Sequence, residues 1–174
     1  MSRFYGAHNT YTTTLDKTHS ELILGFKSTN QDQNEFLIND SFGYAKLNLG
    51  VTYLLFNSVN DRLVSFITLA MGTIKLPEDW SIRGKLLREY PKDFPQQLPA
   101  LRIGQLATQA NEENKGAGAY LLSFAVRKAI ELQAIVGCAY LVIDANPDKV
   151  TWYEKNGFKV LRRGEKTVCM YFEL

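Results

Sequence analysis

The stretch 101–118 constrains the fold of this chain most strongly, because it predicts three consecutive elements. Residues 101–107 are mostly apolar, which is typical of a strand, and residues 109–114 form a polar loop. Residues 116–132 open with a glycine pair and continue with apolar side chains at helical spacing, which predicts an amphipathic helix. We therefore expect a strand, a loop and a helix N-terminus in direct succession.

Gly116 and Gly118 leave the first turn of this helix without side chains. The N–H groups there have no partner within the helix, and the positive end of the helix dipole lies beside them. Such an end suits a phosphate group, and Lys115 adds a positive charge. The segment predicts a cradle for a pyrophosphate, and a flexible helix entry is the structural alternative.

Two common phosphate motifs do not fit this stretch. A P-loop needs a lysine and then a serine or threonine directly after its second glycine, where Ala119 and Tyr120 stand here. The dinucleotide fingerprint needs a third glycine, and that position is Leu121.

Composition indicates one globular domain. The chain has 174 residues, 45% of them hydrophobic, and a net charge of +2, which gives no strong electrostatic case for a nucleic acid or a membrane surface. Cys138 and Cys169 lack metal-site spacing and lie far in sequence from His8 and His19, so we expect no metal and reduced thiols in a cytoplasmic protein. No apolar run has the length of a membrane span.

Local patterns predict the remaining elements. We expect a polar lead-in or tail over residues 1–20 and one domain over residues 21–174. Residues 39–41 are expected to supply caps between two helices. Strands are expected at 21–26, 51–56, 63–71, 139–143, 158–161 and 167–172, and helices at 33–37, 42–49, 80–90 and after Pro147. This order predicts an α/β (α+β) fold, with helices on both faces of a mixed, mostly antiparallel sheet.

Two motifs in this order resemble the GNAT superfamily of acetyl-CoA-dependent N-acetyltransferases. The pyrophosphate motif of that family is Gln or Arg, two residues, Gly, one residue, then Gly or Ala, and it falls on residues 113–118. The second signature falls on Asn146, Tyr153 and the pair 157–158. The resemblance covers most of residues 21–174 and implies acetyl-CoA as the acetyl donor.

The resemblance also implies roles for individual residues. The pantetheine arm would lie along the backbone of residues 106–108, and the pyrophosphate would accept N–H groups of residues 115–119. Tyr153 would be the general acid for the departing thiolate, since a tyrosine with a pKa near 10 is protonated at neutral pH; a buried core aromatic is the alternative. The predicted coenzyme-binding residues are Leu106, Ala107, Thr108, Glu113, Asn114, Lys115, Gly116, Ala117, Gly118, Ala119 and Asn146. Glu113 departs from the family motif and places a carboxylate near the phosphates, which Lys115 is expected to offset.

A narrower resemblance concerns the acceptor. Residues 99–109 are similar to a strand of the GNAT toxins that acetylate aminoacyl-tRNA, with Gln105 and Gln109 in place of that strand's arginine and aspartate. No carboxylate occurs between Ala100 and Gln109 to deprotonate a lysine amine, whose pKa is about 10.4. An α-amine, with a pKa of about 7.7–8.0, needs less help.

We therefore predict an N-acetyltransferase that acts on a primary α-amine, with aminoacyl-tRNA as the sharpest form of the prediction. A small-molecule or peptide N-acetyltransferase and a non-catalytic acyl-CoA-binding regulatory module stay open as alternatives. A homodimer is expected from the family resemblance. A tRNA would need a basic face, and the candidates are Arg83, Lys85, Arg88 and Lys92 in one segment and Lys155, Lys159, Arg162, Arg163 and Lys166 in another.

Overall fold

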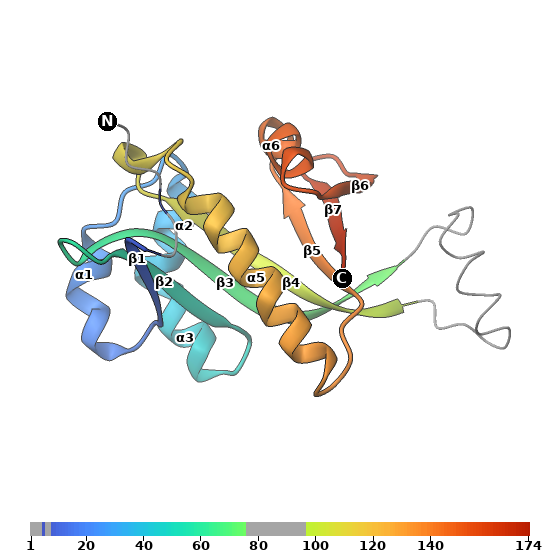
Figure 1. The fold of residues 1–174 in the computed structure, drawn as a ribbon, viewed down its shortest axis with the longest axis horizontal. Coiled ribbons are helices and arrows are strands. Elements are labelled where there is room, and N and C mark those ends of the chain that lie inside the picture. The colour runs from blue at the N-terminus through green and yellow to red at the C-terminus, as the bar shows by residue number, and fades with distance from the viewer. Residues whose placement is uncertain (1–4, 6–7, 76–96) are drawn as a thin grey trace, which may run out of the picture. The chain divides into compact units, whose positions relative to one another are not determined.

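The computed structural model describes residues 5, 8–75 and 97–174 of the chain (Figure 1). Seven strands of this part form one sheet in the order β1-β2-β3-β4-β5-β7-β6. The strands are β1 (Thr10–Thr14), β2 (Val51–Asn57), β3 (Arg62–Lys75), β4 (Gln97–Thr108), β5 (Tyr140–Ala145), β6 (Lys159–Arg163) and β7 (Val168–Glu173). The helices are α1 (Ser20–Leu24), α2 (Gln31–Glu35), α3 (Ser41–Lys46), α5 (Ala117–Gln133) and α6 (Val150–Lys155). The predicted fold class, a mixed sheet with flanking helices, is confirmed.

The chain divides into two compact units. The first unit contains Met1–Ala70 and Ile103–Lys128, and the second contains Met71–Arg102 and Ala129–Leu174. Strands β3 and β4 and helix α5 each contribute residues to both units.

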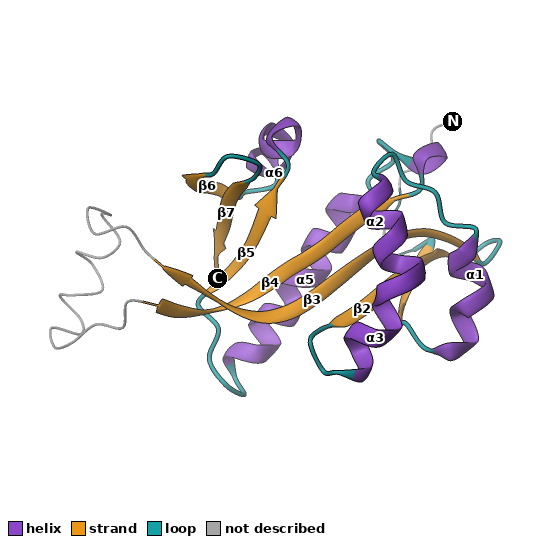
Figure 2. Ribbon diagram, turned by 180° about the vertical axis from the view of Figure 1, so that it is seen from behind, coloured by secondary structure: helices purple, strands orange, loops and turns teal. Residues whose placement is uncertain are grey.

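In the first unit, helices cover both faces of the strands. β2 pairs antiparallel with β1 and with β3, and β2 and β3 form a hairpin at the strand ranges predicted from the sequence. Helices α1 to α3 lie on one face and α5 on the other (Figures 1 and 2). On the α5 side, the Phe124 ring packs edge-on against Tyr53 of β2 at 4.9 Å between centroids. The core on the opposite side consists of Leu15, Ile23, Phe26, Leu37, Leu54, Phe56, Leu63, Phe66 and Ala107.

The N-terminal part differs from the predicted elements. Thr10–Thr14 of the expected loose lead-in form β1 and pair with β2, as suits β-branched threonines beside an open strand edge. The strand predicted at 21–26 is wrong, because Ser20–Leu24 form α1. Ile23 and Phe26 are both 1% exposed, and their separation of three residues is typical of one helix face. Leu24 is exposed to solvent.

Residues 31–46 form one continuous helical run instead of two capped helices. The Asn30 side chain accepts the N–H groups of Asp32 and Gln33 and so starts α2. The expected caps at 39–41 lie in and after a π-helical turn, Phe36–Asp40, that leads directly into α3. Ser41 is buried there and donates to the Leu37 carbonyl at 2.5 Å. Ala45 and Leu49, two apolar residues of the predicted helix 42–49, are exposed.

In the second unit, β7 pairs antiparallel with β5 and with β6. The three predicted strands are confirmed with shifts of one or two residues at their ends. The Ala139 N–H donates to the Pro99 carbonyl at 2.9 Å, next to the start of β5. Pro147 occupies the first turn of a short 3-10 helix, Pro147–Lys149, that precedes α6. The helix predicted at 80–90 lies outside the described residues.

Candidate coenzyme and catalytic site

The loop between β4 and α5 has the backbone geometry of an anion cradle. Asn114 and Gly116 have φ values of 60° and 90°, so the chain turns through two left-handed residues before α5 begins at Ala117. The first helical hydrogen bond runs from the Tyr120 N–H to the Gly116 carbonyl at 2.9 Å. The N–H groups of residues 117–119 therefore precede the helical ladder, at the positive end of a 17-residue helix. They can be donated to a phosphate.

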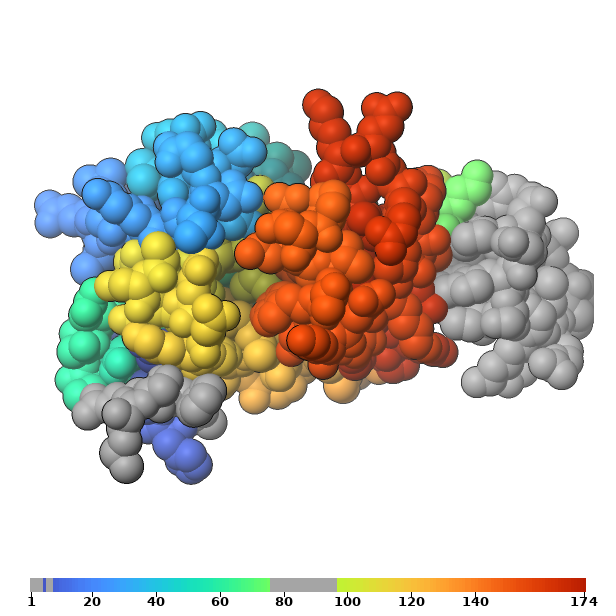
Figure 3. Space-filling view, turned by 90° about the horizontal axis from the view of Figure 1, so that it is seen from above, coloured from blue at the N-terminus to red at the C-terminus, as the bar shows by residue number. Residues whose placement is uncertain are grey.

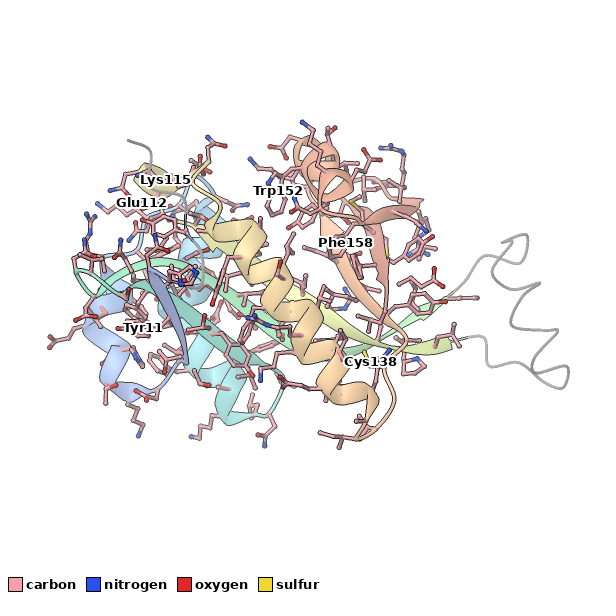
Figure 4. All side chains as sticks on the ribbon, viewed as in Figure 1. Tyr11, Glu112, Lys115, Cys138, Trp152 and Phe158 are labelled. Carbon is pink, nitrogen blue, oxygen red and sulfur yellow. The ribbon has the colours of Figure 1, made fainter. Side chains whose placement is uncertain are left out.

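The charge of Lys115 is paired within the loop. Its Nζ lies 2.8 Å from Glu112 Oε2 and 3.0 Å from the Asn111 carbonyl oxygen (Figure 4). The Tyr5 hydroxyl donates to the same Glu112 oxygen at 2.5 Å, and the Tyr5 N–H donates to the Lys115 carbonyl at 2.6 Å. Burial opposes ionisation of Glu112, but the hydrogen bonds from Lys115 and Tyr5 outweigh it and lower the pKa of this carboxyl.

The segment between α1 and α2 docks on the cradle loop, and the two lie side by side at the surface (Figure 3). Thr29 donates its hydroxyl to Glu113 Oε1 at 2.9 Å, and the Ala110 N–H donates to the Lys27 carbonyl at 2.9 Å. Gln109 accepts the Lys27 N–H at 3.1 Å and donates to the Leu63 carbonyl at 3.3 Å. Gln109, which stands where the toxin strand has an aspartate, therefore ties three segments of the first unit together.

The end of β4, predicted to carry the pantetheine arm, already has hydrogen-bond partners. Gln33 Nε2 donates to the Leu106 carbonyl at 2.8 Å, and the fully buried Ser65 hydroxyl donates to the Ala107 carbonyl at 2.6 Å. The Thr108 hydroxyl lies 3.0 Å from that of Ser65. Gln33 was not among the predicted site residues, since an amide in a polar helical run carries no sequence signal for contact with a strand.

In the second unit, Tyr153 lies on α6 inside an aromatic cluster. It is 6% exposed, and its ring packs edge-on against Trp152 at 4.8 Å and Phe158 at 5.6 Å between centroids; Figure 4 labels both neighbours. Burial raises the pKa of Tyr153 far above its ordinary value, so the phenol stays protonated. Asn146 is exposed and caps the 3-10 turn with no side-chain hydrogen bond, which leaves its amide accessible.

No group of His, Cys, Asp and Glu side chains in the described residues is arranged to hold a metal ion. Cys138 and Cys169 are free thiols. None of the helices in that part of the chain is both long and apolar enough to span a membrane.

Comparison with solved structures identifies the fold. No protein-family model matches the sequence. The structure is similar to AtaT complexed with acetyl-methionyl-tRNAfMet, with a TM-score of 0.78, 19% identity and coverage of 95% of each chain. A tyrosine-to-phenylalanine mutant of KacT has the same TM-score, the same identity and the same coverage of each chain. AtaTR bound with acetyl-CoA has a TM-score of 0.73 and 19% identity over 95% of this chain and 94% of that one. The chain therefore shares the fold of AtaT and KacT, a mixed sheet flanked by helices as the sequence predicted.

Proposed function

We propose that this protein is an N-acetyltransferase that moves an acetyl group from acetyl-CoA to a primary α-amine, with aminoacyl-tRNA as its acceptor. The observation that carries the proposal is the cradle loop, with left-handed Asn114 and Gly116 ahead of the N–H groups of residues 117–119, which precede the helical ladder. The fold is shared with AtaT, which was solved both with an acetylated aminoacyl-tRNA and, in AtaTR, with acetyl-CoA.

Each residue then has one task. Bound acetyl-CoA supplies the thioester whose carbonyl the acceptor amine attacks. The cradle N–H groups hold the pyrophosphate, and the exposed Asn146 amide contacts the coenzyme. As the carbon–sulfur bond breaks, the Tyr153 hydroxyl donates its proton to the thiolate, and the proton that the amine loses passes through solvent to the phenolate, which restores the hydroxyl. Burial raises the pKa of Tyr153, which keeps the phenol protonated before the step and requires that its proton be replaced as it is given up.

The acceptor class follows from a missing base. Residues 100–109 on and after β4 contain no carboxylate. An α-amine with a pKa of about 7.7–8.0 is partly neutral at physiological pH, whereas a lysine amine with a pKa of about 10.4 is almost wholly charged. This favours an α-amine acceptor.

A non-catalytic acyl-CoA-binding module is the second candidate. It is favoured by the burial of Tyr153 between Trp152 and Phe158, which is also the environment of a structural core tyrosine. The module would bind coenzyme at the same cradle without transferring the acetyl group.

Binding and turnover measured on matched tyrosine variants separate the two candidates. Acetyl-CoA affinity is measured by calorimetry, and acetyl transfer is measured with aminoacyl-tRNA and with a free peptide α-amine. We expect Tyr153→Phe to bind coenzyme normally but to lose transfer, and Tyr140→Phe, at a similarly buried tyrosine of the second unit, to keep both. Undiminished transfer by Tyr153→Phe would remove its acid role. Normal binding with no transfer in the unaltered protein would support the module, and no binding would end the coenzyme proposal.

A further inference from the structure

The second unit has a sheet face that its helix α6 does not cover. On the α6 side, Phe158 packs against Phe172 of β7 at 5.6 Å, so Phe172 points toward that helix. Neighbouring side chains of a strand alternate between faces, so Tyr171 of β7 points the other way. It packs edge-on against Tyr140 of β5 at 6.0 Å.

A row of polar side chains crosses this second face. Asp144 lies two residues beyond Val142, which belongs to the same apolar cluster as Tyr140 and Tyr171. Asp144 is paired in register with Cys169, and Cys169 with Arg162 of β6. Arg102 of β4 completes the row, since its guanidinium lies 2.5 Å from the Asp144 carboxylate.

A cavity of about 540 Å³ opens over this row. Its walls include apolar Ile74, Val142 and Leu161 and the cationic Lys75, Arg102 and Arg162. Asp144 is the one carboxylate among the lining residues, so cations outnumber it three to one. The cavity is therefore complementary to an anion that also carries an apolar surface.

Gly72 makes room for Arg102 in this cavity. A Cβ atom at position 72 would lie 3.3 Å from Cβ and 3.5 Å from Nε of Arg102. With glycine there, the arginine side chain can lie across β3. Its guanidinium is half-exposed and keeps N–H donors beyond the one that contacts Asp144.

The cations are spread over three strands. Between Arg102 on β4 and Arg162 on β6 the strand order contains β5 and β7, so three strand spacings of about 4.8 Å separate them by roughly 14 Å. Lys75 lies on β3, on the other side of β4. An extended polyanion fits such a row better than a single phosphate or carboxylate does. Arginine forks match phosphate oxygens in a bidentate geometry.

We propose that this face, which we call the β3–β6 groove (Lys75, Arg102, Arg162, Ile74, Val142 and Leu161), binds the phosphodiester backbone of the acceptor RNA, with an unstacked base against its apolar wall. The assignment rests on the proposed function and adds the surface that holds the RNA. It selects Arg162 from the basic residues that the sequence offered and adds Lys75 and Arg102. Arg83, Lys85, Arg88 and Lys92 lie outside the described residues.

The sequence contains a matched control for this groove. Arg162 is in register with Cys169 on the groove face, whereas the adjacent Arg163 is in register with Val168 on the alternate face. Both arginines are exposed. Arg162→Gln and Arg163→Gln therefore make the same change of charge one residue apart, on opposite faces of β6.

The test is a fluorescence-anisotropy titration with a labelled RNA hairpin that ends in single-stranded CCA, repeated over a series of KCl concentrations. We expect Arg162→Gln to weaken binding and to reduce the slope of log K against log salt by about 0.7–0.9, the loss of one phosphate contact. Arg163→Gln should keep the affinity and slope of the unaltered protein. Gly72→Ala places a methyl group against the Arg102 side chain and displaces it, so this variant should weaken RNA binding as well.

Two further measurements make the outcome decisive. The affinity of Arg162→Gln for acetyl-CoA, measured by calorimetry, should equal that of the unaltered protein. A failure of the unaltered protein to bind acetyl-CoA would refute the proposed function. The RNA titration would then still show whether the groove binds RNA. Equal losses in the two arginine variants, or no loss in either, overturn the groove assignment. Binding of polyglutamate with no binding of the RNA hairpin also overturns it, in favour of an acidic peptide.

Discussion

Replacing Gly116 with alanine tests the cradle most directly. Gly116 has a φ of 90°, a region that costs a residue with a Cβ about 1–2 kcal/mol. The added Cβ would meet the Tyr5 carbonyl oxygen at 3.5 Å, which is ordinary contact, so backbone strain is the whole cost. A cost of 1–2 kcal/mol is a factor of roughly 5–30 in an equilibrium. We expect the loop of Gly116→Ala to relax out of the left-handed conformation in the free protein and to return to it on binding, which weakens acetyl-CoA binding by up to that factor.

Gly118→Ala is the matched control for this change. Position 118 lies inside α5, where alanine is favoured over glycine by up to about 1 kcal/mol, and the family motif accepts alanine there. Calorimetry should show near-normal acetyl-CoA affinity for Gly118→Ala. In thermal unfolding without ligand, the Tm of Gly116→Ala should fall by less than the roughly 2–8 °C that the full strain would cause, because the relaxed loop avoids most of it. Equal coenzyme affinity in the two variants would refute the cradle, because left-handed backbone at Gly116 would then be irrelevant to binding.

Three further predictions concern the contacts that hold the cradle loop. Tyr5→Phe removes the hydroxyl that donates to Glu112 and should weaken acetyl-CoA binding measured by calorimetry, whereas Tyr11→Phe, which removes a hydroxyl donated to Asp61 at an exposed site, should leave it unchanged. The pKa of Glu112 is lowered in the folded state, so the stability that its carboxylate contributes is present above the unfolded pKa of about 4.3 and is lost as the pH falls through the folded pKa. In urea titrations below about pH 5, the free energy of unfolding of Glu112→Gln should therefore fall less steeply with pH than that of the unaltered protein. An identical pH dependence in the two proteins would contradict this. Gln109→Leu removes the bonds to the Lys27 N–H and the Leu63 carbonyl, which are exposed and part-buried respectively, and should lower the free energy of unfolding by about 0.5–1.5 kcal/mol, measured in urea. An unchanged free energy of unfolding would show that solvent replaces both bonds.

The parts of the fold that the sequence predicted are those with long, self-consistent patterns. Helix α5 and strand β4 were predicted because the period of 3.6 and the apolar run each extend over many residues. The helix α1 was missed because Leu22, Ile23 and Leu24 form a short apolar run, which is also typical of a buried strand. Over five residues the two periods cannot be told apart, and the deciding fact, that Ile23 and Phe26 share one core, exists only in the folded chain.

In the candidate site, too, local features were predictable from the sequence and distant contacts were not. The start of α5 at the glycine pair was predicted from the sequence, whereas the left-handed backbone of Asn114 and Gly116 was not. The partners of the loop were not predictable, since Tyr5, Thr29 and Gln33 lie 107, 84 and 73 residues from the groups that they contact. No period or spacing links residues so far apart. Only the folded chain brings the Tyr5 segment and the α1–α2 segment to the loop after β4, and Gln33 of α2 to β4 itself.

The charges around the cradle indicate which forces would hold the coenzyme phosphates. Lys115 was expected to offset the carboxylate of Glu113, but its ammonium is paired with Glu112, and Glu113 accepts the Thr29 hydroxyl instead. The one cation inside the loop is thus neutralised by its neighbour. A pyrophosphate at this position would be held chiefly by backbone N–H groups and the α5 dipole, which keep their direction without any side-chain ordering. A loop that relies on backbone donors must keep its conformation, and this explains why Tyr5, Thr29 and Gln109 all fix the loop.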